Sequence, residues 1–245
     1  MRYRRLDLNL LVIFHQLLMD RSVSTTAENL GLTQPAFAAA AAALTSVLAF
    51  PAAYAIAFKM SDTARRWAVF LMVIPFFTSY LVRVYSWQIF LSDNGIINVI
   101  LGWVGLGPFQ MLNTVGATMI GYLTLAFPLV VLLQLFSLVF IDRTLIEAAH
   151  NMRCGRLRTV FEVVIPSART GLVIAALFCF ILSFGDFVSP VYLGGGDPTT
   201  LSILITDTTK SGQQWPRAAV VAIMMILTLF AVATAAVKAA YGRRG

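Results

Sequence analysis

An uncharged apolar stretch in the middle of the chain decides its fold: VGATMIGYLTLAFPLVVLLQLFSLVF, which runs from Val115 to Phe140. A helix needs about 20 mostly apolar residues to cross the hydrocarbon core of a bilayer. This stretch is long enough, and it is too uniformly apolar to form a surface helix of a water-soluble protein. We therefore predict a membrane-spanning helix here.

Four other stretches of similar character flank it. The chain of 245 residues is 59% hydrophobic and only 12% charged, with a mean hydropathy of +0.82, so a water-soluble domain is excluded. Prolines inside the stretches, such as Pro75 and Pro190, should be tolerated because neighbouring helices can satisfy the freed carbonyls. The sequence predicts an all-α, polytopic membrane helical bundle with about five transmembrane helices, the others being at about Phe37–Phe58, Trp67–Phe90, Gly171–Leu193 and Ala218–Tyr241.

Positive charges gather in alternate loops. Short cytoplasmic loops of membrane proteins carry an excess of lysine and arginine. The segment 59–66 carries three, the segment 141–170 carries five and the C-terminal end carries three, whereas the loops 91–114 and 194–216 carry one between them. We expect the first three to face the cytoplasm and the other two to face outside. The second outer loop should contain a short helix near Leu201–Lys210.

The N-terminal 36 residues conflict with this orientation. Five spans and a cytoplasmic C-terminus would place them outside, yet they carry Arg2, Arg4, Arg5 and Arg21, which favour the inside. Their apolar segment Leu8–Met19 would be about 18 Å long as a helix, well short of a hydrocarbon core of about 30 Å. It does not resemble a signal peptide, since no small-residue cleavage site follows. This segment does not fit the rest of the chain.

The residue types that carry most enzyme chemistry are sparse. His15 and His150 stand alone, and Cys154 and Cys179 would lie at different depths in the membrane. None of the three lysines follows a glycine, which excludes a P-loop for ATP phosphates. The sequence therefore predicts no catalytic residue, no metal site and no cofactor bound by this chain.

The arginine-rich segment after the central stretch reads IDRTLIEAAHNMRCGRLRTVFEVVIPSARTGL, from Ile141 to Leu172. Asp142 can cap a first helix, which Gly155 can end, and a second helix over Leu157–Val164 should stop at Pro166. The first helix would have apolar residues on one side and basic residues on the other. Such a pair of amphipathic helices can dock into a groove of a partner, or it can simply close a loop at the membrane surface.

Within this segment, Glu147-Ala148-Ala149 followed by Val163-Val164-Ile165-Pro166 resembles the EAA loop of ABC-importer permeases. In that family the loop sits in a cleft of the cytoplasmic ATPase. The resemblance therefore implies a cytoplasmic coupling loop at about 141–170. The residues assigned to it are Glu147, Ala148, Ala149, Arg153, Cys154, Gly155, Ile165 and Pro166.

One position departs from the family pattern. Arg153 stands where the family has the glycine that lets the loop turn between its two helices. Either the turn accommodates Arg153, because Gly155 lies two residues later, or the exchange impairs docking to the ATPase. Both alternatives remain open at this point.

The resemblance extends over about residues 37–241. It implies the MetI-like permease fold of ABC importers, and because that family usually has six spans, we expect the fold to lack its first helix. Four further motifs, in order, are similar to the spermidine/putrescine subgroup: IPFFTSYLVRVYSW (Ile74–Trp87), NGIIN (Asn94–Asn98), FILSFGDFVSPVYLGG (Phe180–Gly195) and WP (Trp215-Pro216).

A function follows from this resemblance. It implies a multi-pass permease subunit in the bacterial inner membrane, within an ATP-driven, binding-protein-dependent importer of polyamines or, alternatively, of another small solute. The implied partners are cytoplasmic ATPase subunits that bind the ATP, a second related permease subunit, a periplasmic substrate-binding protein and the lipid bilayer.

One acid, Asp186, lies inside a predicted span. It follows Gly171 by fifteen residues, or about 22 Å of helix, which places it in the outer half of the membrane. Intramembrane acids usually face a bundle interior or a water-filled path, and a polycation would be attracted to a carboxylate with aromatic neighbours. These arguments suggest a substrate path formed by Asp186, Tyr85, Trp87 and Phe187.

Each of these residues also has a structural interpretation. Asp186 could instead pair with a helix end or with Arg83 and fix the packing of helices. We expect Arg83 itself to extend its side chain to the outer membrane interface. Trp87 and Trp215 could serve only as aromatic anchors at the interface.

The N-terminal segment has a resemblance of its own. LDLNLLVIFHQLLMDRSVSTTAENLGLTQPA (Leu6–Ala36) resembles the start of a LysR-type helix-turn-helix regulator. The resemblance implies a first helix at Leu6–Met19, a second at Ser24–Leu30, a turn at Gly31 and a recognition helix that opens at Thr33-Gln34-Pro35. A recognition helix needs polar and basic side chains to contact bases and phosphates, whereas this chain continues with Phe37 and six alanines.

These observations predict a chimera, with a helix-turn-helix remnant at 1–36 joined to a transmembrane permease domain at 37–245. We expect no nucleic acid as a partner. The alternatives are a chance resemblance of a short helix pair, a LysR-type DNA-binding fragment, and an inactive fusion product that neither assembles nor transports.

Overall fold

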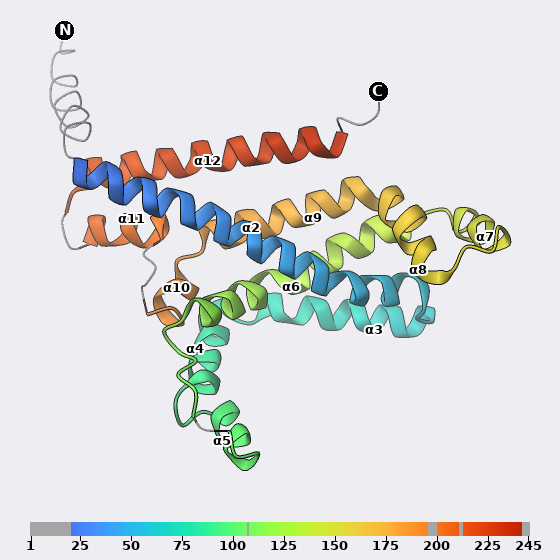
Figure 1. The fold of residues 1–245 in the computed structure, drawn as a ribbon, viewed down its shortest axis with the longest axis horizontal. Helices are drawn as coiled ribbons and strands as arrows, with labels where there is room; N and C mark the ends of the chain where they lie inside the picture. Colours follow the sequence, from blue (N-terminus) through green and yellow to red (C-terminus); the bar gives the residue numbers. More distant parts are fainter. Residues whose placement is uncertain (1–20, 107, 196–199, 211–212, 242–245) are drawn as a thin grey trace, which may run out of the picture.

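The computed structural model describes residues 21–106, 108–195, 200–210 and 213–241. Throughout these ranges the regular structure is helical, without a strand, which confirms the predicted all-α class. Four helices dominate: α2 (Arg21–Phe58), α6 (Val115–Val139), α9 (Ile165–Gly185) and α12 (Trp215–Tyr241) (Figure 1). In the described part of the chain, four segments are long and apolar enough to cross a membrane singly, and each overlaps one of these helices.

Three of the predicted spans are confirmed with small shifts at their ends. The apolar part of α2 runs from Gln34 to Phe58, α6 ends one residue before its predicted end, and α12 begins three residues before its predicted start. α6 remains a single helix although Pro128 lies inside it. The short helix predicted in the second outer loop is present as α11 (Leu201–Lys210).

The second predicted span, Trp67–Phe90, is wrong as a single helix. Pro75 has no N–H for the preceding turn, and the amide and hydroxyl of Thr78 both donate to the Pro75 carbonyl, at 3.3 and 2.9 Å. This closed turn bends the chain by 93°, so the segment is a broken span or a re-entrant loop. The bent pair extends from Asp62 to Trp103. Before the bend it contains α3 (Asp62–Val73) and the 3-10 turn η1 (Ile74–Phe77), and after the bend α4 (Tyr80–Leu91) and α5 (Ile96–Trp103).

The fourth predicted span, Gly171–Leu193, begins much earlier than expected. The break predicted at Pro166 is wrong, because the Ile165 amide bonds the Val160 carbonyl in a π-helical turn and the proline falls in the first turn of α9. One helix of 30 residues therefore runs from Arg156 to Gly185. It consists of α8 (Arg156–Thr159), the π-helical turn η2 (Val160–Val164) and α9.

The same span also ends earlier than predicted. α9 stops at Gly185, Asp186 is extended, and α10 (Val188–Tyr192) follows. The Asp186 carboxylate accepts hydrogen bonds from the first amides of α10, as a capping side chain does. Pro190 also has no N–H to bond the Asp186 carbonyl. Asp186 therefore lies in a break between two helices and not inside a straight span.

The core forms where α2, α6 and α9 pack together. The α2 side of this core is rich in alanine, and α6 and α9 contribute larger residues such as Val130 and Phe184. At one crossing, a side chain on Gly171 would collide with Ser137. Small residues let helix backbones approach closely, which is how helices associate in lipid. Large apolar side chains such as Phe230 are exposed on the outside of the bundle instead.

The turn implied for the N-terminal segment is absent. α2 runs without a break from Arg21 to Phe58, so the predicted turn at Gly31 and the new helix opening at 33–35 are wrong. Alanine has the highest helix propensity, and the alanine run after Phe37 favours helix on both sides of it. The predicted first helix, Leu6–Met19, lies outside the described residues.

The basic loops lie at one end of the bundle. The turn between α2 and α3, helix α7 (Arg143–Asn151) and the last turn of α12, which contains Lys238, lie at the right-hand end in Figure 1. α10 and α11 lie at the opposite end. This arrangement agrees with the charge-based orientation. The end with α7 is termed the inner end, and the end with α10 is termed the outer end.

Candidate functional site

The predicted coupling loop forms the inner end of the structure, where α7 and the start of α8 extend beyond the bundle (Figure 1). Asp142 caps α7 as predicted, because its carboxylate accepts a hydrogen bond from the Thr144 amide at 2.9 Å. Hydrogen bonds from the amide and the hydroxyl of Thr144 lower the pKa of Asp142. The cap is therefore ionised at neutral pH.

The turn after α7 is made by Arg153. α7 ends at Asn151, so the prediction that Gly155 ends it is wrong; Gly155 instead precedes α8 with an ordinary extended backbone. Arg153 has a φ of +62°, in the left-handed region that favours glycine. The amides of Met152, Arg153 and Cys154 donate to α7 carbonyls at 2.9–3.1 Å. An arginine thus makes the turn that the family pattern assigns to a glycine.

Replacing Arg153 with glycine should stabilise this turn. A non-glycine residue in the left-handed region costs about 1–2 kcal/mol, whereas glycine adopts it freely. We expect Arg153→Gly to slow amide hydrogen exchange at Met152 and Cys154 by roughly five- to thirtyfold. Arg156→Gly is the matched control, because it removes an arginine from the helical first turn of α8 and should speed exchange nearby. Faster or unchanged exchange in Arg153→Gly would contradict the strained turn.

Apolar side chains on the coupling loop face away from the bundle. Met152, Leu157 and Phe161 are 84%, 77% and 66% exposed. The assigned loop residues lie along the same segment: Glu147, Ala148, Arg153, Gly155 and Pro166 are exposed, and Ala149, Cys154 and Ile165 are half-buried. A surface with exposed apolar groups and an acid is suited to binding another protein.

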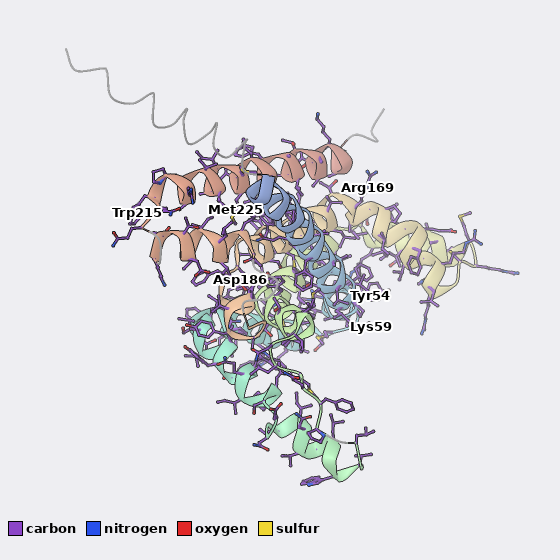
Figure 2. The ribbon with its side chains drawn as sticks, turned by 60° about the vertical axis from the view of Figure 1, so that its left-hand side comes forward. Tyr54, Lys59, Arg169, Asp186, Trp215 and Met225 are labelled. Carbon is purple, nitrogen blue, oxygen red and sulfur yellow. The ribbon has the colours of Figure 1, made fainter. Side chains whose placement is uncertain are left out.

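At the outer end, Asp186 lies in the break between α9 and α10, and Figure 2 shows it inside the bundle. It is 7% exposed. Its carboxylate accepts hydrogen bonds from the amides of Val188 (2.9 Å) and Ser189 (3.3 Å) and from the hydroxyl of Tyr80 (2.5 Å). The hydroxyls of Tyr80 and Ser189 also share a hydrogen bond. The carboxylate therefore holds the start of α10 against α4.

The aromatic residues proposed for the substrate path have other neighbours. The ring of Tyr85 lies 5.0 Å from that of Tyr192, and the ring of Trp87 lies 5.9 Å from that of Phe90. Phe187 follows Asp186 in the chain and is 43% exposed. Within the described residues, neither the Tyr85 hydroxyl nor the Trp87 indole N–H donates to the Asp186 carboxylate, and Phe187 has no side-chain donor.

Two residues that bind Asp186, Tyr80 and Ser189, were not predicted from the sequence. Tyr80 opens α4 directly after the bend, and Ser189 lies in α10. A side chain on Gly121 of α6 would collide with Ser189, so α10 packs closely on α6. Both residues belong to motifs quoted above, but 106 residues separate Tyr80 from Asp186, and no local pattern predicts that contact.

Arg83 does not extend to the outer interface, so that prediction is wrong. Its Nη1 donates to the Thr124 carbonyl on α6 at 3.2 Å, and its guanidinium lies 5.7 Å from the centre of the Tyr80 ring. Pro128 lacks the N–H that would bond the Thr124 carbonyl within the helix. Arg83 thus satisfies a carbonyl that the proline leaves free, and in the described structure it forms no ion pair with Asp186.

Other candidate features lie apart from these two clusters. Trp215 is 67% exposed at the start of α12 (Figure 2), a position that suits an interfacial anchor. A hollow of about 420 Å³ on α3 is lined by Thr63, Arg66, Trp67 and Phe70. The described ranges contain no group of three or more His, Cys, Asp or Glu side chains that could hold a metal ion.

Comparisons with known proteins agree with this architecture. A family model described as binding-protein-dependent transport system inner membrane component matches residues 45–244. The chain is 28% identical, over 185 residues, to the spermidine/putrescine transport system permease protein PotB of Salmonella typhimurium (strain SL1344); the match covers 75% of this chain and 64% of that protein's length. The fold is similar to that of a bacterial ABC transporter involved in the import of the acidic polysaccharide alginate, with a TM-score of 0.72 at 16% identity, covering 100% of this chain and 86% of that chain.

A second similarity concerns a short stretch. Over 36 residues the chain is 78% identical to the HTH-type transcriptional activator NahR of Pseudomonas putida. This match covers 15% of this chain and 12% of that protein. A short regulator-like stretch and a long stretch similar to transport proteins therefore occur in one chain.

Proposed function

Because the chain belongs to the family of binding-protein-dependent transport system inner membrane components, we propose that it is a permease subunit of an ATP-driven importer for polyamines such as spermidine and putrescine. The observation that carries this proposal is the similarity to a spermidine/putrescine permease over 185 residues. The family match includes both the coupling loop and Asp186.

The proposed complex contains cytoplasmic ATPase subunits, a second related permease subunit and a periplasmic substrate-binding protein, within a lipid bilayer. ATP would bind to the ATPase subunits and not to this chain. The family description supports the binding-protein partner. The exposed side chains of Met152, Leu157 and Phe161 support docking of the ATPase at the inner end.

Coupling would act through the continuous helix from Arg156 to Gly185. Its inner end follows directly on the turn after α7, and its outer end leads directly into the break at Asp186. Movement of the coupling loop by the ATPase would therefore change the packing around Asp186. Alternating exposure of a substrate site to the two sides of the membrane follows from such movement.

In this proposal Asp186 contacts an ammonium group of the substrate. A carboxylate offers about four acceptor positions, and Val188, Ser189 and Tyr80 occupy three of them. One position remains for a cation. Tyr85 and Trp87, on the same helix as Tyr80, and Phe187 would add aromatic faces along the path.

Uptake by the assembled complex tests this function. Cells should express this chain together with its ATPase, its companion permease and its binding protein, and uptake of labelled spermidine and putrescine should be compared with that of cells lacking only this chain. We expect saturable, energy-dependent uptake that requires the chain. Uptake of a different small solute alone would favour the alternative importer. Failure of the chain to co-purify with its partners would indicate an inactive fusion.

The orientation of the coupling loop can be measured with its native cysteine. Cys154 is half-buried in the loop, whereas Cys179 is fully buried in α9. If the basic loops face the cytoplasm, a membrane-impermeant maleimide should label Cys154 in inside-out vesicles and not in intact spheroplasts. Cys154→Ser is the control for background labelling. Labelling in intact spheroplasts would mean that the spans are inverted.

The proposal includes a fusion of a regulator-like remnant at 1–36 with a permease domain at 37–245. The 78% identity over 36 residues and the start of the family match at residue 45 support it. α2 continues through the residues that would open a recognition helix and into the apolar span, which argues against a DNA-binding role. We therefore propose that this chain does not have a nucleic acid as a partner.

A further inference from the structure

One buried side chain, Gln34, joins three helices at the outer end. It is 5% exposed and lies at the start of the apolar part of α2. Its Nε2 donates to the Phe184 carbonyl at 2.7 Å, and its Oε1 accepts from the Leu201 amide at 2.6 Å. Phe184 lies in the last turn of α9, and Leu201 is the first residue of α11. One amide group therefore links α2, α9 and α11.

The two backbone groups that Gln34 binds are of a kind that helices leave unpaired. The last carbonyls and the first amides of a helix have no partner within the helix. In an apolar surrounding, each needs a partner from elsewhere. A carboxamide presents a donor and an acceptor on one planar group, so it can satisfy both kinds at once. Leucine or alanine at this position would satisfy neither of them.

Phe184 lies two residues before Asp186 and inside the region that the family model matches, whereas Gln34 lies outside that region. The family match begins at residue 45, so Gln34 belongs to the upstream part of α2. The same part places Ala38 and Ala42 in the core against α6 and α9. The upstream segment is thus built into the bundle and is not merely appended to it.

We propose that Gln34 is a positioning residue that clasps the start of the apolar part of α2 to the last turn of α9 and the first residue of α11, and that the sequence upstream of the family-matched region is therefore a working part of the permease. This inference rests on the proposed transport function. Both hydrogen bonds form together only while the Gln34 turn of α2, the last turn of α9 and the start of α11 stay in contact. They therefore favour the conformation described here over any conformation in which those ends separate.

A second buried glutamine provides a matched control. Gln134 is 1% exposed, and its Nε2 donates to the Ser46 carbonyl at 3.0 Å, which joins α6 to α2. Replacing Gln134 removes a buried hydrogen bond from a side-chain amide to the backbone of another helix, as replacing Gln34 does. It touches neither the end of α9 nor the start of α11. If Gln34 had only a structural role, Gln34→Leu and Gln134→Leu should change basal ATP hydrolysis and amide exchange at the start of α11 by the same factor.

The experiment uses the complex with its ATPase in lipid nanodiscs and compares Gln34→Leu, Gln34→Glu and Gln134→Leu with the wild type. We assign the conformation described here to the complex without binding protein. We therefore expect Gln34→Leu to raise ATP hydrolysis without binding protein roughly fivefold, because this conformation loses two buried hydrogen bonds. Amide exchange at the start of α11 should rise by a similar factor. Gln134→Leu should leave both the basal ATP hydrolysis and the amide exchange of α11 near the wild-type values. Gln34→Glu keeps the acceptor for the Leu201 amide but loses the donor to the Phe184 carbonyl. It should therefore raise hydrolysis without binding protein by a smaller factor than Gln34→Leu does. If Gln34→Leu does not assemble, Gln34→Glu is the variant that tests the proposal.

Two results would overturn the clasp. One is wild-type exchange and basal hydrolysis in the Gln34 variants, and the other is an equal rise in Gln134→Leu. Failure of the proposed function has a different signature, in which the wild-type complex shows no stimulation by binding protein. The exchange comparison between Gln34→Leu and Gln134→Leu would still decide whether Gln34 holds α11.

Discussion

Replacing Glu147 with lysine should reduce uptake at least about tenfold while the chain still reaches the membrane. Glu147 is exposed on α7, and the described structure gives it no ion pair. Arg143, Arg153 and Arg156 surround it in sequence, so it is an acid in a basic loop. If the proposed ATPase presents a basic group to Glu147, the reversed charge would bring two cations together, and like charges at an interface oppose binding.

The measurement is uptake together with ATP hydrolysis by the reconstituted complex. If the loop no longer docks to the proposed ATPase, both uptake and the ATP hydrolysis that binding protein stimulates should fall, while insertion of the chain into the membrane is unchanged. Glu162→Lys is the matched control: Glu162 is also exposed in this region, but its Oε1 pairs with Arg158 Nε at 2.8 Å within the loop. An exposed pair of this kind contributes little, so the control should change uptake only slightly. Unchanged uptake in Glu147→Lys, or equal losses in both variants, would refute the assigned role.

Replacing Asp186 with asparagine should lower polyamine uptake roughly tenfold to a hundredfold. Asparagine caps helices about as well as aspartate, and its one oxygen can still accept from the Val188 amide, so most of the start of α10 should be preserved. Its NH2 group cannot accept the hydrogen bonds that the second carboxylate oxygen takes from Ser189 and Tyr80. The charge that would bind an ammonium group is lost, and a hydrogen bond to a charged group contributes about 1.5–3 kcal/mol. The expected loss is therefore in transport and not in assembly.

Asp186→Ala separates this role from the structural interpretation. Alanine removes the cap and the acceptor for Tyr80, so this variant should also lose ordered packing of α10. If Asp186 only fixes helices, uptake should follow the loss of packing: Asp186→Asn, which keeps the cap to Val188, should retain most of the uptake, and Asp186→Ala should lose most of it. Asp207→Asn is the control for removing an acid near the outer end, since Asp207 is exposed on α11, and it should leave uptake unchanged.

The sequence predicted long helices well and their interruptions badly. The boundaries of α6 and α12 were placed within three residues, because uniform apolar runs of that length have few other conformations in lipid. Average hydropathy does not register a local break. Pro75 with Thr78 bends one predicted span, and Asp186 with Pro190 ends another, although both stretches are apolar overall.

The same limit applies to the candidate sites, where local features could be predicted and contacts between distant residues could not. The Asp142 cap follows from local sequence, and the departure at Arg153 was visible against the family pattern. Contacts between distant helices did not follow. Tyr80 meets Asp186 across 106 residues, and Gln34 meets Leu201 across 167. Such pairs depend on how the bundle packs, which no single-sequence periodicity contains.

The uninterrupted helix from Arg156 to Gly185 has a mechanical consequence. At 1.5 Å per residue, its 30 residues form a lever about 45 Å long. A tilt of about 5° at the inner end would displace the outer tip by roughly 4 Å, which exceeds the reach of any hydrogen bond. A small rotation in the cytoplasm would therefore be enough to detach the tip from both Gln34 and the neighbours of Asp186. The amplification comes from length alone and requires no chain of side chains to relay it.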